Sequence, residues 1–339
     1  MKLLVTGGCG FIGCNFIRHV LEARPDWHIL NLDALTYAGT ATSLPEIHEA
    51  ATPHPRYRLV VGDVCDAQTV DPLVGECDAV VHFAAQTHVD RSIAAAKPFV
   101  RTNVLGTQVL IDAIRRAGPA DARRLVHAGT DEVYGDLPLT PHEPRFTEDS
   151  PLRPNSPYAA SKAAADHLIL AACHTHGLDA VITRGSNTFG PWQYPEKVIP
   201  LFVTNLLEGR TVPLYGTGEN VRDWIHVADH CTAILAALER GGGGRVYNIA
   251  AGNERSNIEL TRTILNIMGQ DEAIIEHVPD RPGHDRRYAL DTTRARQELG
   301  WAPTHTAWPD SLAQTIDWYR SHAAWWRPLK HETGRIDGR

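Results

Sequence analysis

The sequence has few cysteines and no long apolar run, and each absence excludes a class of protein. Its six cysteines in 339 residues form no C-x-x-C pair, so we expect free thiols in a reducing compartment and no disulfide scaffold. No run of about 18 apolar residues is present to span a bilayer. The N-terminal MKLLVTGG is apolar for only four residues before its glycines, which is too short for a signal peptide. We therefore expect a cytoplasmic protein.

The chain also has no excess of basic residues. It carries 33 Lys and Arg against 40 Asp and Glu, a formal charge of -7. Nucleic acid and anionic membranes reward basic surfaces, so neither is an expected partner. A few local Arg or Lys residues would still suffice to bind a small anionic ligand such as a diphosphate.

What the sequence does contain is a regular alternation of short apolar runs and amphipathic segments in its first half. The hydrophobic share of 43% is sufficient for a large core. The expected strands are Leu3–Thr6, His28–Leu32, Tyr57–Val61, Ala79–Phe83, Arg124–Ala128 and Ala180–Arg184. Helical patterns such as Phe11–Glu22 and Asn103–Ala117 lie between or after them. This order predicts an α/β fold with a doubly wound parallel sheet, the Rossmann arrangement.

The first glycines form a dinucleotide-binding pattern. Gly7, Gly10 and Gly13 in TGGCGFIG follow a strand and open a helix, which lets the backbone approach a pyrophosphate at the helix N-terminus. Asp33 follows Gly13 by twenty residues, at the end of the next strand, where a carboxylate can hold the adenosine ribose. The same carboxylate would repel the 2′-phosphate of NADP, and LDALTY offers no neighbouring Arg, so NAD is the expected cofactor.

Other residues at strand ends are expected to contact the same cofactor. Asp63 follows the third strand and either contacts the adenine edge or caps its own strand end; both interpretations stay open here. The small residues of HFAAQTH suit a close approach to the cofactor. The full predicted set is Gly7, Gly10, Phe11, Ile12, Gly13, Asp33, Thr36, Asp63, Val64, Ala84, Ala85, Thr87, Tyr158 and Lys162.

In the second half of the chain the alternation of strand and helix patterns is less regular. Prolines at positions 191, 195, 200 and 213 interrupt it, and the remaining segments are mixed, including helices near Leu201–Glu208 and Ile258–Met268 and a strand at Val246–Ile249. We expect an NAD-binding Rossmann domain over residues 1–190 and a smaller mixed α/β substrate-binding lobe over residues 191–339. Parts of the later chain are allowed to cross back to the first domain.

A catalytic pair follows the fifth expected strand. Tyr158 and Lys162 form Y-x-x-x-K and lie on one face of a helix. An ammonium beside the phenol favours the phenolate, which suits removal of a proton from a sugar hydroxyl during hydride transfer to nicotinamide.

The stretch HAGTDEVYG makes the resemblance specific. With the glycine loop, Tyr158 and Lys162, it resembles the dTDP-glucose 4,6-dehydratases within the extended short-chain dehydrogenase/reductase family, and Thr130 stands where that family has Ser or Thr. The resemblance covers almost the whole chain. Further matching stretches are LDALTYAG, HVDRS, TNVLGT, SPYAASKAAADHL, GPWQYPEKVIPLF, YGTGENVRDWIHVADH, RPGHDRRYALD and WYRSHAAWW.

The resemblance implies an activity and assigns roles. The expected reaction converts dTDP-glucose to dTDP-4-keto-6-deoxyglucose and water by carbon-4 oxidation, elimination across carbons 5 and 6, and hydride return to carbon 6. The implied catalytic residues are Thr130, Asp131, Glu132, Tyr158 and Lys162, with Asp131 as acid and Glu132 as base. These two roles require different environments, so that one carboxyl stays protonated while the other is ionised.

The resemblance also implies a substrate site and a homodimer. Lys197 and Arg222 are expected at the diphosphate of the nucleotide sugar. The other expected substrate contacts are His88, Asn187, Glu196, Asn257 and Tyr288. Members of the family pair through the Y-x-x-x-K helix and the helix near residues 103–117, and Ala159, Ala160 and Ala163–Ala165 would permit close approach.

Some positions depart from the family pattern and leave alternatives open. Gly129 replaces a common Ser, Thr188 and Phe189 replace Asn and Tyr, Trp192 replaces Tyr, and Cys9 replaces Ala. Since residues 187–192 are expected near the substrate, a UDP-sugar 4,6-dehydratase or a nucleotide-sugar 4-epimerase is the alternative enzyme. Asp131 and Glu132 argue against an epimerase. A non-catalytic dinucleotide-binding regulatory protein is the alternative from another class. No metal is expected, because CHTHG at residues 173–177 lacks a second ligand pair.

Overall fold

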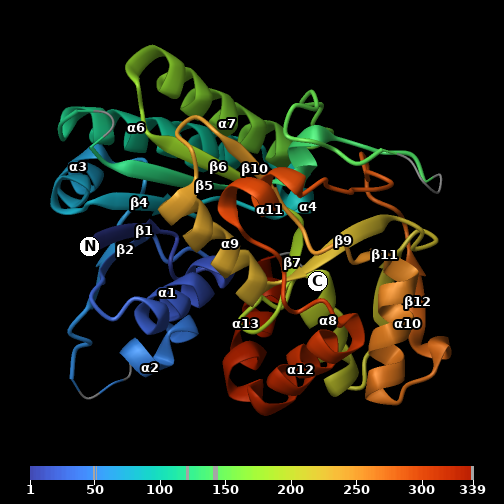
Figure 1. Cartoon of the computed structure of the whole chain (residues 1–339). Coiled ribbons are helices and arrows are strands. Elements are labelled where there is room, and N and C mark those ends of the chain that lie inside the picture. Colours follow the sequence, from blue (N-terminus) through green and yellow to red (C-terminus); the bar gives the residue numbers. More distant parts are fainter. Residues whose placement is uncertain (49, 51, 120–121, 140–143, 337–339) are drawn as a thin grey trace.

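The apolar runs of the first half form a parallel sheet at the centre of the protein (Figure 1). The structure is a computed structural model that describes residues 1–48, 50, 52–119, 122–139 and 144–336. In spatial order the seven strands are β10 (Val246–Ile249), β6 (Ala180–Gly185), β5 (Arg124–Thr130), β4 (Ala79–His82), β1 (Lys2–Thr6), β2 (His28–Asp33) and β3 (Tyr57–Val61). All neighbouring pairs are parallel, so the predicted doubly wound sheet is confirmed.

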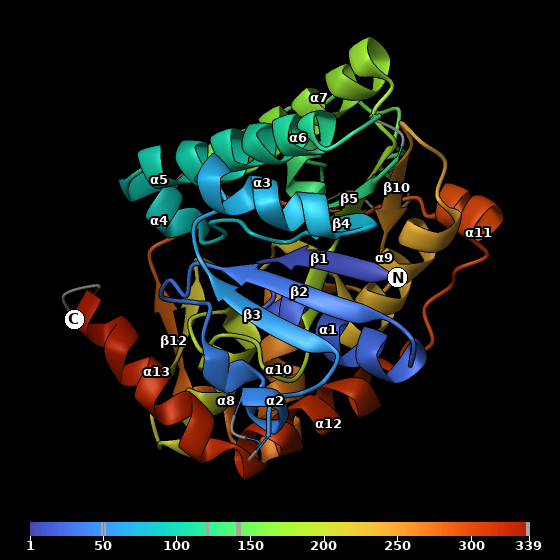
Figure 2. The same cartoon turned by 90° about the vertical axis from the view of Figure 1, so that its left-hand side faces the viewer.

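Helices cover both faces of this sheet, as Figures 1 and 2 show. One layer consists of α3 (Ala67–Glu76), α6 (Gly106–Arg116) and α7 (Pro157–His176). The opposite layer consists of α1 (Phe11–Ala23), α9 (Val227–Arg240) and α11 (Thr293–Leu299). The predicted helix at residues 103–117 is present, but a π-helical segment, Val100–Leu105, precedes α6 and continues into it.

The two layers arise from alternation along buried strands. In β1, Leu3 and Val5 pack in the cluster with α1 and α9, whereas Leu4 between them packs with α3 and α6. Successive side chains of a strand point to opposite faces, so a strand covered on both sides must be apolar throughout. This is why the predicted strands are continuous apolar runs.

A second lobe lies below the sheet in Figure 1 and has its own apolar core. Its helices are α8 (Val198–Leu207), α10 (Asn257–Met268), α12 (Trp308–Ser321) and α13 (Ala323–Ile336). Its strands are β7 (Asn187–Phe189), β8 (Val212–Tyr215), β9 (Val221–His226), β11 (Glu254–Ser256) and β12 (Ile275–Val278). Short helices α2 (Pro45–His48), α4 (Val89–Ala94) and α5 (Lys97–Phe99) complete the fold.

The later chain does return to the large sheet, because β10 pairs with β6. The division of the chain at residue 190 stays a prediction, and residues 337–339 of the predicted second lobe lie outside the described residues. Within the described part of the chain, no helix is both long and apolar enough to cross a membrane.

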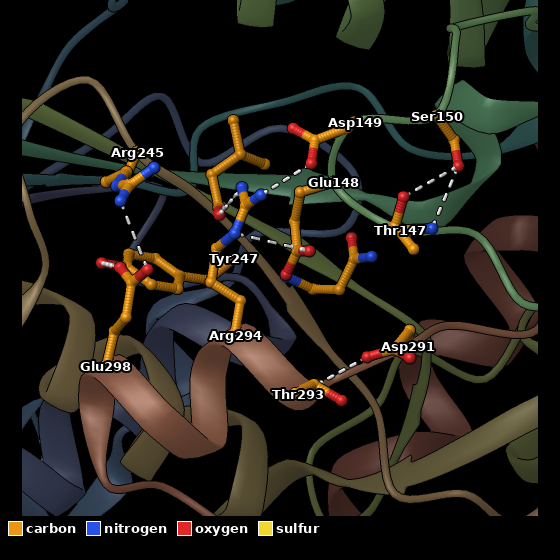
Figure 3. Close-up of polar contacts among 12 residues, drawn as sticks. Thr147, Glu148, Asp149, Ser150, Arg245, Tyr247, Asp291, Thr293, Arg294 and Glu298 are labelled. Atoms are coloured by element: carbon orange, nitrogen blue, oxygen red, sulfur yellow. Dashed lines mark hydrogen bonds and ion pairs between the residues drawn. The ribbon is translucent and has the colours of Figure 1, made fainter.

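The outer edge of β10 is capped by side chains (Figure 3). The Asn248 N–H donates to Glu148 Oε1 at 2.9 Å, and Arg294 Nη1 donates to the Val246 carbonyl at 3.3 Å. Arg294 Nη2 also donates to Asp149 Oδ2 at 3.0 Å, which ties α11 to the loop that carries Glu148. An open strand edge is a template for unwanted pairing, so these side chains substitute for an eighth strand.

We expect Glu148→Ala to lower the free energy of unfolding by about 2 kcal/mol, because the Asn248 N–H would stay buried without its acceptor. The matched control is Asp149→Ala, whose side chain is 83% exposed and pairs with the same arginine. That change should cost less than about 0.5 kcal/mol. Urea unfolding followed by circular dichroism measures both variants. Equal losses of unfolding free energy in the two variants would show that the outer edge of β10 does not depend on Glu148.

Candidate active site

A cavity of about 590 Å³ lies at the carboxyl ends of the parallel strands. Residues that follow β1, β2, β3, β4 and β5 all contribute to its wall. Ligands of open α/β sheets bind at this edge, where the strand order reverses. The residues predicted to contact the dinucleotide all line it: Gly7, Gly10, Phe11, Ile12, Gly13, Asp33, Thr36, Asp63, Val64, Ala84, Ala85, Thr87, Tyr158 and Lys162.

The glycine loop leaves room for a dinucleotide backbone. Gly7 has φ +71°, and a Cβ there would lie 2.6 Å from the Ala84 amide nitrogen. A Cβ on Gly13 would overlap the Gly7 carbonyl. Gly10 is the N-cap of α1 and brings no side chain to the helix terminus. The residues present therefore fit a pyrophosphate against the N-terminus of α1.

Asp33 connects the end of β2 to the glycine loop. Its carboxylate accepts hydrogen bonds from the amides of Cys9 and Leu35, each at 2.8 Å. Burial raises the pKa of this carboxyl, and the two amides oppose the shift. Asp33 is thus fixed in place at the cavity wall with its charge favoured by backbone donors.

Asp63 caps its own strand end. Its Oδ1 accepts from the Cys65 amide at 2.8 Å, and its Oδ2 accepts from Arg101 at 2.6 Å. The strand-end cap is therefore present, while a contact with an adenine edge stays a prediction.

The five predicted catalytic residues line the same cavity as the cofactor residues. Thr130 ends β5, and its hydroxyl accepts from the Glu132 amide at 3.3 Å, which starts a short 3-10 turn, Asp131–Tyr134. Tyr158 lies in the first turn of α7, where its amide donates to Ser92 at 3.1 Å. A strand end and a helix start thereby bring together residues that are 28 positions apart in the chain.

The two adjacent carboxyl groups lie in different electrostatic environments. Burial raises the pKa of Asp131 well above its usual range, the Glu132 charge raises it further, and Arg222 opposes the shift. Burial also raises the pKa of Glu132, but three cations oppose it: Arg281, Arg222 and Lys197. Asp131 therefore has the stronger tendency to hold a proton, and the ionised form of Glu132 is the one that more neighbouring cations favour.

Tyr158 and Lys162 are both almost fully buried. Burial raises the pKa of the Tyr158 phenol, the Glu132 charge adds to it, and a hydrogen bond with Thr130 opposes it. Burial lowers the pKa of Lys162 to about 8, and Asp166 opposes that shift. The Lys162 ammonium donates to the Ala128 carbonyl at 2.7 Å. Its predicted effect on the tyrosine therefore stays a prediction.

Three of the predicted substrate residues, Asn187, Glu196 and Lys197, line the cavity, and four do not. His88 caps α4, with its ring 3.8 Å from Glu196. Asn257 begins α10.

Arg222 and Tyr288 form a pair just beyond the lining. The Arg222 guanidinium lies 4.3 Å from the centre of the Tyr288 ring and donates to the Asp285 carbonyl at 2.9 Å. Both residues are coupled to Glu132, since Arg222 opposes the pKa rise of Glu132, and the Glu132 charge adds to the effect of burial in raising the pKa of Tyr288. Contact with substrate stays a prediction for all seven residues.

Three residues of this site were missed from sequence. Arg281 is the charge with the largest effect on Glu132 after burial. Tyr37 donates to Glu196 at 3.0 Å, and Arg91 pairs with the same carboxylate at 3.2 Å. All three lie in the matching stretches RPGHD, LDALTYAG and HVDRS, but nothing in their spacing shows that they meet.

The structure places the positions that depart from the family pattern and accounts for one of them. Asn187 and Thr188 line the cavity, whereas Trp192 does not, and the expected closeness of residues 187–192 to the substrate stays a prediction. Trp192 has φ +68° and packs its ring against Trp318 and Trp325 at centroid distances of 4.8 and 5.2 Å. Gly129 has no room for a side chain, because a Cβ would lie 2.7 Å from the Thr183 carbonyl.

The family model described as GDP-mannose 4,6 dehydratase matches residues 4–309. A dTDP-glucose 4,6-dehydratase of Streptomyces niveus is 51% identical over 334 residues, which cover 97% of this chain and 96% of the relative. A protein of the same name from Mycobacterium tuberculosis is 50% identical, covering 98% of this chain and 97% of the relative.

Solved structures agree with this similarity. A dTDP-glucose 4,6-dehydratase from Streptomyces venezuelae, solved with NAD bound, has a TM-score of 0.92 and 49% identity, covering 97% of this chain and 100% of that chain. One from Bacillus anthracis, in complex with NAD, has a TM-score of 0.88 and 43% identity over 97% of this chain and 99% of that chain. A UDP-glucose 4-epimerase from Thermus thermophilus has a TM-score of 0.84 at 30% identity, with 95% and 100% covered.

We expect NAD to bind at least about tenfold more tightly than NADP, a difference of about 1.4 kcal/mol, because the extra phosphate would meet the Asp33 carboxylate. Isothermal titration calorimetry with the two dinucleotides measures the ratio. Asp33→Asn should reduce the ratio of NADP to NAD dissociation constants, because the variant lacks the charge. Its amide oxygen could still accept the hydrogen bond from the Cys9 amide. Equal affinities in the parent protein would contradict this role of Asp33.

Proposed function

Because this chain belongs to the GDP-mannose 4,6 dehydratase family, we propose that it is an NAD-dependent dTDP-glucose 4,6-dehydratase. It is a hydro-lyase that converts dTDP-glucose to dTDP-4-keto-6-deoxyglucose and water. The observation that carries this proposal is the placement of Asp131 and Glu132 in one cavity with Tyr158 and Lys162. Oxidation alone needs only the second pair, whereas loss of water needs an acid and a base beside it.

NAD would be held by the glycine loop, the start of α1 and Asp33. When bound it supplies an acceptor for the hydride of carbon 4 and returns that hydride to carbon 6. The tight approach at Gly7 and Gly13 and the oriented Asp33 carboxylate support this placement. Relatives solved with NAD bound support the same choice of cofactor.

The first step is removal of the carbon-4 hydroxyl proton by Tyr158. Its phenol is nearly buried and hydrogen-bonded with Thr130, so it is fixed in orientation. Since burial and the Glu132 charge both raise the pKa of this phenol, it needs positive charge beside it to act as a base. The Lys162 ammonium, which lines the same cavity, would supply part of that charge, and NAD when bound would add to it.

The second step is elimination of water. The ketone at carbon 4 acidifies the carbon-5 proton, which Glu132 removes, while Asp131 donates its proton to the departing carbon-6 hydroxyl. The raised pKa of Asp131 keeps that proton available at neutral pH. The cations around Glu132 favour its ionised form. The two roles therefore follow from the two environments.

The substrate diphosphate lies, in this proposal, between Lys197, Arg222 and Arg281. All three reduce the pKa rise of Glu132, which shows that their charges reach the catalytic carboxylate. His88, Asn187, Glu196, Asn257 and Tyr288 then place the sugar and the base. The names of the relatives favour thymidine over uridine.

We also propose a homodimer formed by the outer faces of α6 and α7. Of the alanines expected at that interface, Ala159, Ala163 and Ala165 are buried inside the protomer, so only Ala160 and Ala164 are available to a partner. Val100 and Leu105, on the π-helical segment before α6, are 54% and 49% exposed. Apolar side chains this exposed suit burial against a second copy. A cytoplasmic location accords with the six free cysteines.

The dehydratase assignment predicts a separation of steps. Incubation of the parent protein with dTDP-glucose should give a 4-keto product that absorbs in base. Glu132→Gln and Asp131→Asn should still reduce bound cofactor, but should lose about 100- to 10,000-fold in dehydration rate. Glu132→Gln should also fail to exchange the carbon-5 proton with solvent deuterium, whereas Tyr158→Phe should lose cofactor reduction itself.

A cofactor titration of each variant serves as the control for intact binding. Near-parent dehydration rates in both carboxyl variants would mean that the pair is only a polar turn. The protein would then be reassigned to another reaction on the same scaffold, with an epimerised sugar as the product to seek.

The dimer predicts a mass near twice the 37.3 kDa of the chain in light scattering at micromolar concentration. Leu105→Arg should shift the mass to that of the monomer, because a charge would replace an exposed apolar side chain at the interface. Val61→Arg is the matched control, since Val61 is 63% exposed but lies on the far edge strand β3. A parent protein with monomer mass would contradict the proposal.

A further inference from the structure

Lys162 has a neighbour that the reaction described above does not use. The Lys162 ammonium lies 3.1 Å from Nε2 of His127, in addition to its bond to the Ala128 carbonyl. An ammonium has three N–H groups and no lone pair. Two of the three are thus directed at β5, which leaves the third for the cavity that Lys162 lines.

We propose that His127 is a positioning residue for Lys162: it accepts one ammonium N–H and thereby aims the remaining one into the cavity for the oxidation step. This rests on the proposed function, because it assigns a purpose to the orientation of Lys162 in that reaction. His127 itself does not line the cavity, so it acts only through the lysine.

The contact defines the tautomer of the imidazole. Because a lysine ammonium can only donate, Nε2 of His127 must present its lone pair, and Nδ1 must carry the hydrogen. Nδ1 has no hydrogen-bond partner among the described residues, although His127 is 1% exposed. A buried N–H without a partner destabilises the fold. We infer that the contact of Nε2 with the Lys162 ammonium is the reason for this ring orientation.

The ring must also be neutral, and its surroundings keep it so. Burial lowers the pKa of His127 well below its usual range, and the charges of Lys162 and Arg184 lower it further. A protonated imidazole facing the ammonium would be repelled. The neutral ring is therefore a permanent acceptor over the working pH range.

The position of His127 is determined by the sheet and by one buried ion pair. It lies in β5 opposite His82 of β4, with ring centroids 5.2 Å apart. Asp166, one turn after Lys162 in α7, has Oδ1 3.7 Å from Nε2 and Oδ2 2.9 Å from Arg184 Nε. The titratable groups that the Lys162 charge reaches are His127, His82 and Asp166, and the Arg184 charge acts on His127. Tyr158, one turn before Lys162 in α7, lines the same cavity.

The polar chain behind His127 continues to the sheet edge. Arg184 Nη1 donates to the Tyr134 hydroxyl at 2.9 Å, and this hydroxyl donates to Asn248 Oδ1 at 2.7 Å. The Asn248 amide in turn donates to Glu148, which is labelled in Figure 3. The hydrogen bonds of this chain join α7, β6, the 3-10 turn and β10. They therefore fix the position of Asp166, which lies beside His127.

The test compares three buried substitutions. His127→Leu removes the acceptor, His127→Gln places an amide acceptor near the position of Nε2, and His82→Leu is the matched control. His82 is also 1% exposed, but its nitrogens bond to Thr6 and Thr107 and not to Lys162. Should His127→Leu not fold, His127→Asn takes its place, because its amide is too short to reach Lys162.

The first readout is single-turnover reduction of bound cofactor by dTDP-glucose, followed across pH. Removing an acceptor disfavours the ammonium, so the alkaline limb in His127→Leu should move down by about one pH unit. Because the pKa of Lys162 is about 8, this shift gives about a fivefold lower rate at pH 8. The apparent KM for substrate should not change. The rate of His127→Gln should lie within about threefold of the parent rate, and His82→Leu should keep the parent pH profile.

The second readout does not depend on activity. The chain has only five lysines, so the Lys162 resonance can be assigned in protein labelled with ¹³C at lysine Cε, using Lys162→Arg. That resonance should titrate at lower pH in His127→Leu, recover in His127→Gln and match the parent in His82→Leu. If His127→Leu titrates like the parent, or if His127→Gln is no better than His127→Leu, the positioning role is wrong. If the parent makes no 4-keto product, the proposed function fails, and the lysine titration still decides the contact with His127.

Discussion

Strand β5 is held between β4 and β6 by two parallel ladders, and the position of nearly every reacting group depends on that register. Each of its last four residues makes a contact that shapes the site. His127 and the Ala128 carbonyl contact the Lys162 ammonium, Gly129 lets the Thr183 carbonyl of β6 approach, and Thr130 starts the turn that carries both carboxyl groups. A slip of one residue would exchange the two faces and separate these groups.

The same strand end explains how two adjacent acids come to differ. A short 3-10 turn carries both carboxyl groups. Arg222 and a hydrogen bond from Thr130 oppose the effect of burial on Asp131, whereas Arg281, Arg222 and Lys197 oppose it on Glu132. These cations come from the second lobe, whereas the carboxyl groups follow a strand of the first. The difference between the two carboxyl environments is therefore a property of the two lobes together, and neither lobe creates it alone.

The strands of the large sheet and the glycine loop were predictable from sequence because each depends on spacing within one element. The five residues predicted to be catalytic share one cavity, and their roles stay a prediction. Apolar runs such as Tyr57–Val61, glycines at every third position and Tyr158 four residues before Lys162 are local patterns. Contacts between distant elements leave no such pattern. The approach of Tyr37 to Glu196, and of Arg281 to Glu132, depends on how the lobes pack. The left-handed backbone of Trp192, whose ring packs against Trp318 of α12 and Trp325 of α13, has no local sequence pattern either.

The return of the chain to the sheet through β10 has a consequence for synthesis on the ribosome. β6 ends at residue 185 and its outer neighbour β10 is complete only at residue 249, so most of the second lobe's first half emerges in between. At translation rates of about 5–20 residues per second, this interval lasts several seconds. Throughout it the nascent sheet has an open edge on β6 that other chains can pair with. Nascent chains that stop between the lobes keep that edge open, so premature termination in this region exposes a strand that the finished protein always covers.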